Sequence, residues 1–134
     1  MADGVALHDL HPAFEAGYND GDLDAVMALY APDVTVAAED GSVVTGRDAV
    51  RGQLEVLFSM HGRMAVRTRY VLEAGDLALL GCEWTLTVGH ESLASTTAEV
   101  AQRQPGGGWL WILDHPFASL RPAGAGAVAT PADA

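Results

Sequence analysis

Two carboxylates, Glu99 and Asp114, lie on neighbouring predicted strands in the second half of the chain. Residues 105–108, Pro-Gly-Gly-Gly, join these strands. If they form a four-residue hairpin loop, Gln104 pairs with Trp109, and counting back along both strands places Glu99 opposite Asp114. Directly opposed residues on antiparallel strands have Cβ atoms about 4.5–5.5 Å apart. The sequence therefore predicts a close pair of acids.

The predicted surroundings of this pair are apolar, so two ionised carboxylates there repel each other and lose their hydration. The expected response is a shared proton, with the pKa of one carboxyl raised well above its usual range. One protonated acid beside one base is the requirement for general acid–base catalysis. The alternative is a structural role, in which one carboxylate pairs with Arg67, Arg69 or Arg103 and only stabilises the sheet.

The alternation of side chains assigns two faces to the predicted sheet. If the preceding join is centred on His90 and Glu91, Trp84 faces Thr97 and Cys82 faces Glu99. The first face is mostly apolar and is the expected pocket wall: Cys82, Trp84, Leu86, Ser95, Thr97, Glu99, Ala101, Arg103, Leu110, Ile112 and Asp114. The second face carries Trp109, Trp111 and His115, which we expect at a homodimer interface. A bulge in one strand would exchange the faces.

The remaining candidates for chemistry are single residues. His8 and His11 are three positions apart on a predicted helix, and no carboxylate near them in sequence completes a metal-site pattern, so we expect no metal and no cofactor. Cys82 has no neighbouring base in the sequence and is not expected to be a nucleophile. Tyr18 and Tyr30 can each present a hydroxyl to a pocket or belong to the core.

Hydrophobic periodicity predicts helices first and strands afterwards. A helix over Val5–Tyr18 is followed by an acidic turn, in which Asp22 is the expected cap of a short second helix. A strand over Asp33–Ala37 and a third helix ending at Met60 come next. Four long strands then follow, over Met64–Glu73, Leu77–Val88, Ser92–Gln104 and Trp109–Ser119. This order predicts an α+β domain over residues 1–120 with a mixed sheet of about six strands.

Composition narrows the possible partners and compartment. A net charge of −11 argues against nucleic acid, because phosphate binding requires clustered basic residues. No apolar run approaches the roughly 20 residues of a membrane span, and the N-terminal residues do not resemble a signal peptide. The lone Cys82 fits a reducing cytoplasm. Residues 121–134 are rich in Ala, Gly and Pro, and we expect them to form a disordered tail.

Several segments together resemble the nuclear transport factor two-like superfamily, in its SnoaL-like and ketosteroid-isomerase-like branch. They are YNDGDLDAVMALYAPDVTV, TGRDAV, ALLGCEWTLTV and EVAQRQPGGGWLWILDHPF. The resemblance implies a cone-shaped fold, with three N-terminal helices packed in the concave face of a strongly curved mixed β-sheet around a deep apolar pocket. It also implies a homodimer across the outer face of the sheet.

The family contains isomerases, polyketide cyclases, dehydratases, epoxide hydrolases and non-catalytic association domains. Glu99 matches the strand position of the protonated acid of ketosteroid isomerases, whereas Phe14 stands where they carry a tyrosine and Ala38 where they carry the basic aspartate. Epoxide hydrolases of this fold use two inward carboxylates bridged by an arginine.

We therefore predict a small-molecule enzyme that performs isomerisation, cyclisation or dehydration on an apolar carbonyl or polyketide-like compound, with Glu99 and Asp114 catalytic. A non-catalytic ligand-binding or association domain and an epoxide hydrolase remain the alternatives. The expected ligand-binding residues are Phe14, Tyr18, Tyr30, Trp84, Leu86, Thr97, Arg103 and Ile112.

Overall fold

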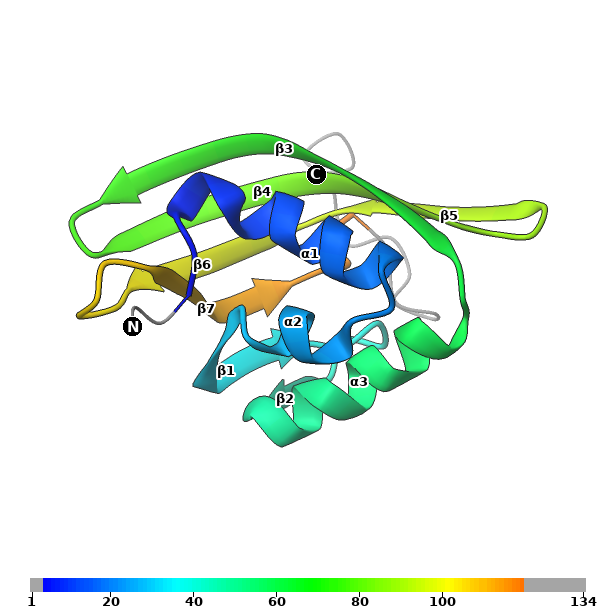
Figure 1. The fold of residues 1–134 in the computed structure, drawn as a ribbon, viewed down its shortest axis with the longest axis horizontal. Coiled ribbons are helices and arrows are strands. Elements are labelled where there is room, and N and C mark those ends of the chain that lie inside the picture. Colours follow the sequence, from blue (N-terminus) through cyan, green and yellow to red (C-terminus); the bar gives the residue numbers. More distant parts are fainter. Residues whose placement is uncertain (1–3, 120–134) are drawn as a thin grey trace, which may run out of the picture.

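The computed structural model describes residues 4–119, so the prediction for the tail, residues 121–134, lies outside the described residues. A short 3₁₀ helix, η1 (Leu7–Asp9), leads into α1 (Leu10–Asn19), and α2 (Leu23–Met27) and α3 (Arg47–Ser59) follow. The three α-helices lie along one side of a curved sheet, and the long strands of the sheet arch over α1 (Figure 1). No helix in the described part of the chain has the length and apolar character needed to cross a membrane.

One sheet of seven strands forms the other layer. Its strands are β1 (Tyr30–Ala37), β2 (Val43–Thr45), β3 (Arg63–Ala74), β4 (Leu77–Val88), β5 (Glu91–Thr96), β6 (Ala98–Arg103) and β7 (Trp109–His115). They are ordered β2-β1-β7-β6-β4-β3, and β5 also pairs with β4. β1 and β7 run parallel, whereas the other pairs are antiparallel. The predicted α+β fold, with helices packed on a curved mixed sheet, is confirmed.

Local sequence signals account for several boundaries. Asp22 caps α2 as predicted, because its Oδ1 accepts a hydrogen bond from the Ala25 amide at 3.0 Å. β1 begins at Tyr30, three residues before the expected start, and Pro32 lies inside it on an exposed position. The expected third strand is divided at Thr97 into β5 and β6.

A β-bulge in β7 decides which residues enter the core. Arg103, not Gln104, pairs with Trp109, so the hairpin loop is one residue longer than predicted. Ile112 then has no partner on β6, and this bulge restores the predicted pairing of Glu99 with Asp114. The longer loop and the bulge each shift the register by one residue, so the two shifts cancel at Glu99 and Asp114. Between the loop and the bulge, however, the side chains of β7 lie on the opposite faces from those predicted.

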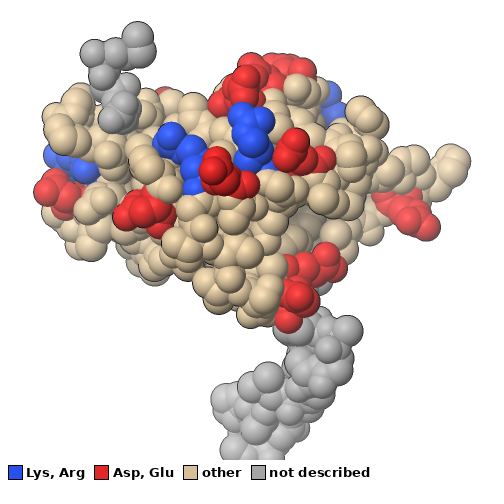
Figure 2. All heavy atoms as spheres, turned by 90° about the horizontal axis from the view of Figure 1, so that it is seen from below, with Lys and Arg blue, Asp and Glu red and all other residues tan. Residues whose placement is uncertain are grey.

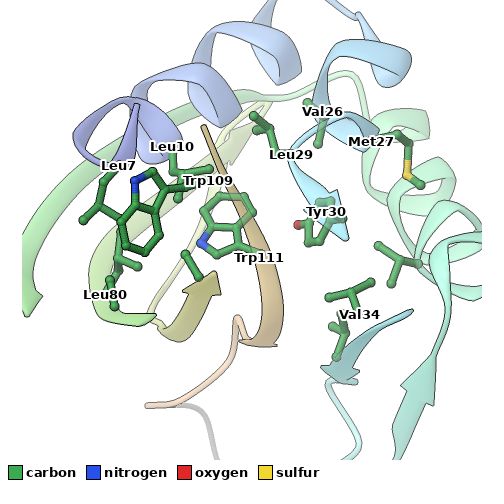
Figure 3. Packing of buried hydrophobic residues seen from close by; sticks show 14 of the residues in the cluster. Leu7, Leu10, Val26, Met27, Leu29, Tyr30, Val34, Leu80, Trp109 and Trp111 are labelled. Carbon is green, nitrogen blue, oxygen red and sulfur yellow. The ribbon is translucent and has the colours of Figure 1, made fainter. Parts of the chain in front are cut away.

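The tryptophans therefore point inward. Trp109 and Trp111 are only 5% and 3% exposed and pack against Leu10 and Leu80 in the main core cluster (Figure 3). The predicted dimer interface through Trp109, Trp111 and His115 is wrong for both tryptophans, and only His115 is exposed. The physical reason is the bulge, which changes the parity of side chains along β7.

Four apolar residues form a row across the sheet face opposite the helices. Cross-strand pairing aligns Leu72 with Leu79, Leu79 with Val100, and Val100 with Leu113. Leu72, Leu79 and Leu113 are 60%, 41% and 47% exposed. We call this set the outer apolar row. Figure 2 shows another view of the surface, on which acidic and basic side chains lie near one another above a broad uncharged area.

Candidate active site

A cavity of about 320 Å³ lies between the helices and the concave face of the sheet. Its size is at the lower end of the range for small-molecule pockets. Its walls are mainly aliphatic and aromatic, and the polar groups gather around a few side chains. The lining residues are His11, Phe14, Tyr30, Val36, Glu39, Val50, Gln53, Leu54, Val56, Leu57, Met60, Met64, Val66, Cys82, Trp84, Thr97, Glu99, Trp111, Asp114, Pro116 and Phe117.

The central feature of the polar part is a buried pair formed by His11 and Glu99. His11 Nε2 contacts Glu99 Oε1, and the two residues are 4% and 2% exposed. The other ring nitrogen, Nδ1, lies 2.8 Å from the hydroxyl oxygen of Thr68 on β3. Both nitrogens of the ring therefore have partners that fix its orientation. Glu99 Oε2, in contrast, is buried and has no hydrogen-bond partner among the described residues.

Sequence reasoning did not predict a role for His11. Its partner Glu99 lies 88 positions away in the sequence, so no local pattern connects the two residues. One sequence signal pointed to an inward position: His11, Phe14 and Tyr18 share one helical face at spacings of three and four. A histidine in line with two aromatic core residues is buried on that face, and burial requires a polar partner.

Asp114 is the second carboxylate of the site and is half-buried. It lies opposite Glu99 as predicted, and the Tyr30 hydroxyl donates a hydrogen bond to its Oδ2 at 3.2 Å. Loss of hydration raises the pKa of Asp114 well above its usual range, and repulsion from Glu99 raises it further. The hydrogen bond from Tyr30 acts in the opposite direction and is outweighed. Burial and the neighbouring Asp114 also raise the pKa of Tyr30, which keeps its hydroxyl a donor.

Among residues 4–119, no arginine forms an ion pair with Glu99 or Asp114, contrary to the structural alternative. Arg67 pairs with Glu83 at the surface, and Arg103 pairs with Glu73 at 3.0 Å. Arg69 does not line the cavity. The partner of Glu99 is thus a histidine from the helical layer.

Cys82 lies next to the His11–Glu99 pair. Burial raises the pKa of its thiol to about 12, against the opposing effect of the Thr97 hydroxyl, which donates to Sγ at 3.4 Å. This shift agrees with the prediction that Cys82 is not a nucleophile. The imidazole of His11, the thiol of Cys82 and the carboxylate of Glu99 place their ligand atoms within 4.8 Å of one another.

The structure places half of the predicted ligand-binding residues on the cavity wall. Phe14, Tyr30, Trp84 and Thr97 line it together with both predicted catalytic acids. The predicted register between β4 and the next strand was wrong by two residues, since Cys82 faces Thr97 and Leu80 pairs with Glu99. A shift of two leaves every side chain on its face, and the assignment of Trp84 and Thr97 was unaffected.

The other four predicted residues lie elsewhere. Tyr18 is buried and donates its hydroxyl to the Leu57 carbonyl at 3.1 Å. Leu86 packs in a second core cluster, and Ile112 occupies the bulge of β7. Arg103 lies over the Trp109 ring at 5.2 Å, near the end of β6. The lining described above includes none of them.

A curved sheet that covers three helices around an apolar pocket with a few acidic groups defines the class of NTF2-like pocket proteins. Residues 12–114 match the SnoaL-like domain family, so the chain belongs to this family and the resemblance found in the sequence is confirmed. No curated protein matches the chain.

Solved structures show the same fold at low sequence identity. A calcium/calmodulin-dependent protein kinase type II association domain proposed in Thiobacillus denitrificans is 23% identical, with a TM-score of 0.71 over 86% of this chain and 96% of that one. A proposed dehydratase of the NTF2-like family from Streptomyces avermitilis is 19% identical, with a TM-score of 0.68 over 81% and 90% of the two chains. A ketosteroid isomerase-like protein from Erwinia carotovora is 18% identical, with a TM-score of 0.66 over 82% and 91%.

Proposed function

We propose that the protein is an enzyme that transfers protons on an apolar carbonyl compound, by isomerisation, cyclisation or dehydration of a polyketide-like substrate. The observation that carries this proposal is the buried arrangement of His11, Glu99 and Asp114 in the wall of an apolar cavity. Such reactions require one group that donates a proton and a second group that accepts one. The fold supports an isomerase- or dehydratase-type role.

The surroundings assign different roles to the two carboxylates. Asp114, with its raised pKa, holds a proton and donates it to the carbonyl oxygen of the substrate. Glu99 acts as the base, and its unpartnered Oε2 accepts the proton from the carbon next to that carbonyl. His11 holds Glu99 in place through Oε1 and is itself held by Thr68. Return of the proton to another carbon, or loss of a hydroxyl group, completes an isomerisation or a dehydration.

The lining also favours a neutral substrate. Within the described part of the chain, the cavity wall includes Glu39, Glu99 and Asp114 but neither lysine nor arginine. A carboxylate or phosphate ligand would therefore enter beside acidic groups without a cation to compensate its charge. The same fact weakens the epoxide hydrolase alternative, because the bridging arginine expected for it does not lie in this wall.

A non-catalytic binding or association domain is the second candidate. The structural likeness to an association domain and the mainly apolar wall both favour it. Both candidates expect an apolar ligand, and they differ in whether that ligand reacts. We further propose that the protein works in the cytoplasm, where the lone Cys82 stays reduced.

Exchange of carbon-bound hydrogen for deuterium separates the two candidates. A panel of neutral cyclic ketones and polyketide-like diketones is first screened for binding through the fluorescence of Trp84 and Trp111, which line the cavity. Each compound that binds is then incubated with the protein in D₂O, without added cofactor, and its α-hydrogens are followed by NMR. The enzyme hypothesis expects exchange that exceeds the buffer rate.

Variants identify the responsible groups. Glu99→Gln and Asp114→Asn are expected to abolish the exchange, because each removes a proton-transfer group and keeps the side-chain shape. Glu83→Gln is the matched control, since Glu83 pairs with Arg67 outside the cavity and its loss should leave exchange unchanged. Binding without exchange in every bound compound would contradict the proposal and support the binding domain.

A further inference from the structure

Three buried side chains of different chemistry converge at the polar end of the cavity. His11 comes from α1, Cys82 from β4 and Glu99 from β6, and they are 4%, 4% and 2% exposed. Their imidazole nitrogen, thiol sulfur and carboxylate oxygen all lie within 4.8 Å of one another. Nitrogen, sulfur and oxygen donors in this combination are the ligands of zinc sites in proteins.

The spacing is close to that of a bound ion. Around a tetrahedral zinc ion, bonds of about 2.0–2.3 Å hold neighbouring ligand atoms roughly 3.3–3.6 Å apart. The His11 and Glu99 atoms are closer than this, and Cys82 Sγ lies at most 4.8 Å from either. Binding of an ion would therefore move the ligand atoms of His11 and Glu99 apart to this spacing.

Three further observations support a ligand at this position. Glu99 Oε2 is a buried acceptor without a partner in the described part of the chain, and a metal ion satisfies such an oxygen. Thr68 Oγ1, 2.8 Å from His11 Nδ1, can accept its N–H and leave the lone pair of Nε2 free for the ion. The Thr97 hydroxyl supports the sulfur of Cys82 in the same way, by donating to Sγ.

We propose that His11, Cys82 and Glu99 bind one divalent metal ion, zinc by the chemistry of the donors. The ion takes the position between His11 Nε2 and the carboxylate of Glu99, and the thiol of Cys82 releases its proton to solvent as the sulfur binds. Because all three residues line the cavity, a fourth coordination position faces the bound ligand. Three protein ligands with one open position are typical of catalytic zinc sites, in which the ion polarises a carbonyl oxygen.

This inference is independent of the metal-free proton transfer proposed above. The metal-bound and metal-free chains are alternative states of one site, because the ion and the His11–Glu99 contact occupy the same place. Metal binding is therefore measured without any organic ligand, and the deuterium exchange is measured with a chelator present. Exchange that persists in chelator, combined with no metal binding, contradicts this inference alone; metal binding without exchange contradicts only the proposed function.

Cobalt(II) is the probe, because it binds in zinc sites and, unlike zinc, absorbs visible light. The full chain is freed of metal with a chelator, dialysed and titrated with Co²⁺. We expect one ion per chain, intense visible bands typical of four-coordinate cobalt, and a near-ultraviolet charge-transfer band from the Cys82 thiolate. Added Zn²⁺ should remove these bands by displacing cobalt.

Variants locate the ion. Cys82→Ser should remove the charge-transfer band, and Glu99→Gln should weaken binding more than tenfold. Thr68→Val keeps all three ligands, and its loss of support for His11 should weaken binding by about 10- to 100-fold. His115→Gln, which changes an exposed histidine outside the cluster, is the matched control and should bind as the original chain does.

The result that overturns the inference is a cobalt spectrum without a thiolate band, or one that Cys82→Ser leaves unchanged. Circular dichroism confirms that each variant is folded. If Glu99→Gln fails to fold, Cys82→Ser and Thr68→Val still decide the question, since neither removes a charged group from the core.

Discussion

Replacing His11 by leucine removes the only hydrogen-bond partner that the Glu99 side chain has among residues 4–119. Both residues are almost fully buried, so solvent cannot replace the lost contact. Removing one member of such a buried pair costs about 3–5 kcal/mol, because the carboxylate stays behind in the core without a partner. Leucine fills most of the imidazole volume beside Trp111, so a cavity contributes little to this cost.

Urea unfolding, followed by tryptophan fluorescence at neutral pH, measures the effect as a change in the free energy of unfolding. His11→Leu should cost about 3–5 kcal/mol. The double variant His11→Leu/Glu99→Met removes both polar groups and should be about as stable as the original chain or more stable. Glu83→Gln is the control, because it breaks an exposed, solvent-screened ion pair with Arg67 and should leave the stability nearly unchanged.

A loss of less than about 1 kcal/mol in the His11→Leu variant would refute the prediction, because it would show that the His11–Glu99 pair is accessible to water or only weakly coupled. The prediction is equally refuted if the double variant costs as much as the two single variants together, because uncoupled residues have additive effects. Only the combination of a costly single variant and a tolerated double variant identifies His11 and Glu99 as one buried unit.

Three other predictions concern Asp114, Tyr30 and the outer apolar row. The raised pKa of Asp114 means that the folded chain binds its proton more tightly than the unfolded chain, so Asp114 lowers stability as pH rises above about 4. Asp114→Asn should therefore gain stability relative to the original chain as pH rises above about 4 in urea titrations, and a difference that does not change with pH would contradict the shift. Tyr30→Phe removes the hydrogen bond from the Tyr30 hydroxyl that lowers the pKa of Asp114, so the decline of stability should continue to higher pH; an unchanged upper end of the decline would show that this hydrogen bond has no effect on the titration. We propose that the expected homodimer forms through the outer apolar row, so light scattering should give a mass near twice 14.0 kDa, and Leu113→Asp or Leu79→Asp should halve it; a chain that is monomeric from the outset would refute this interface.

Local sequence patterns were sufficient for most secondary structure. β4 begins at Leu77 and ends at Val88 as predicted, because glycine-containing turns bound a predominantly apolar run at both ends. The Asp22 cap is equally local, since it depends on a side chain and an amide three residues away. α3, in contrast, begins after Gly46, and no side chain caps it.

The pairing of Glu99 with Asp114 was predicted correctly, but only because two errors in the predicted register cancelled. The loop was one residue longer than assumed, and the bulge at Ile112 compensated for it. The alternation of apolar and polar residues over 109–115 does not predict a bulge, because a bulge depends on how the strand packs against its neighbours and the helices above it. For this reason the side on which Trp109 and Trp111 lie could not be derived from the sequence alone.

The sequence by itself determined which segments are helices and strands and that the fold is of the α+β class. Each of these depends on contacts that are close along the chain or joined by short turns. The tertiary structure decided the partner of Glu99, because His11 is 88 positions away and reaches it only when α1 packs over the sheet. It likewise decided that Cys82 joins them, since the place where three elements converge is set by packing of the layers, which no local pattern records.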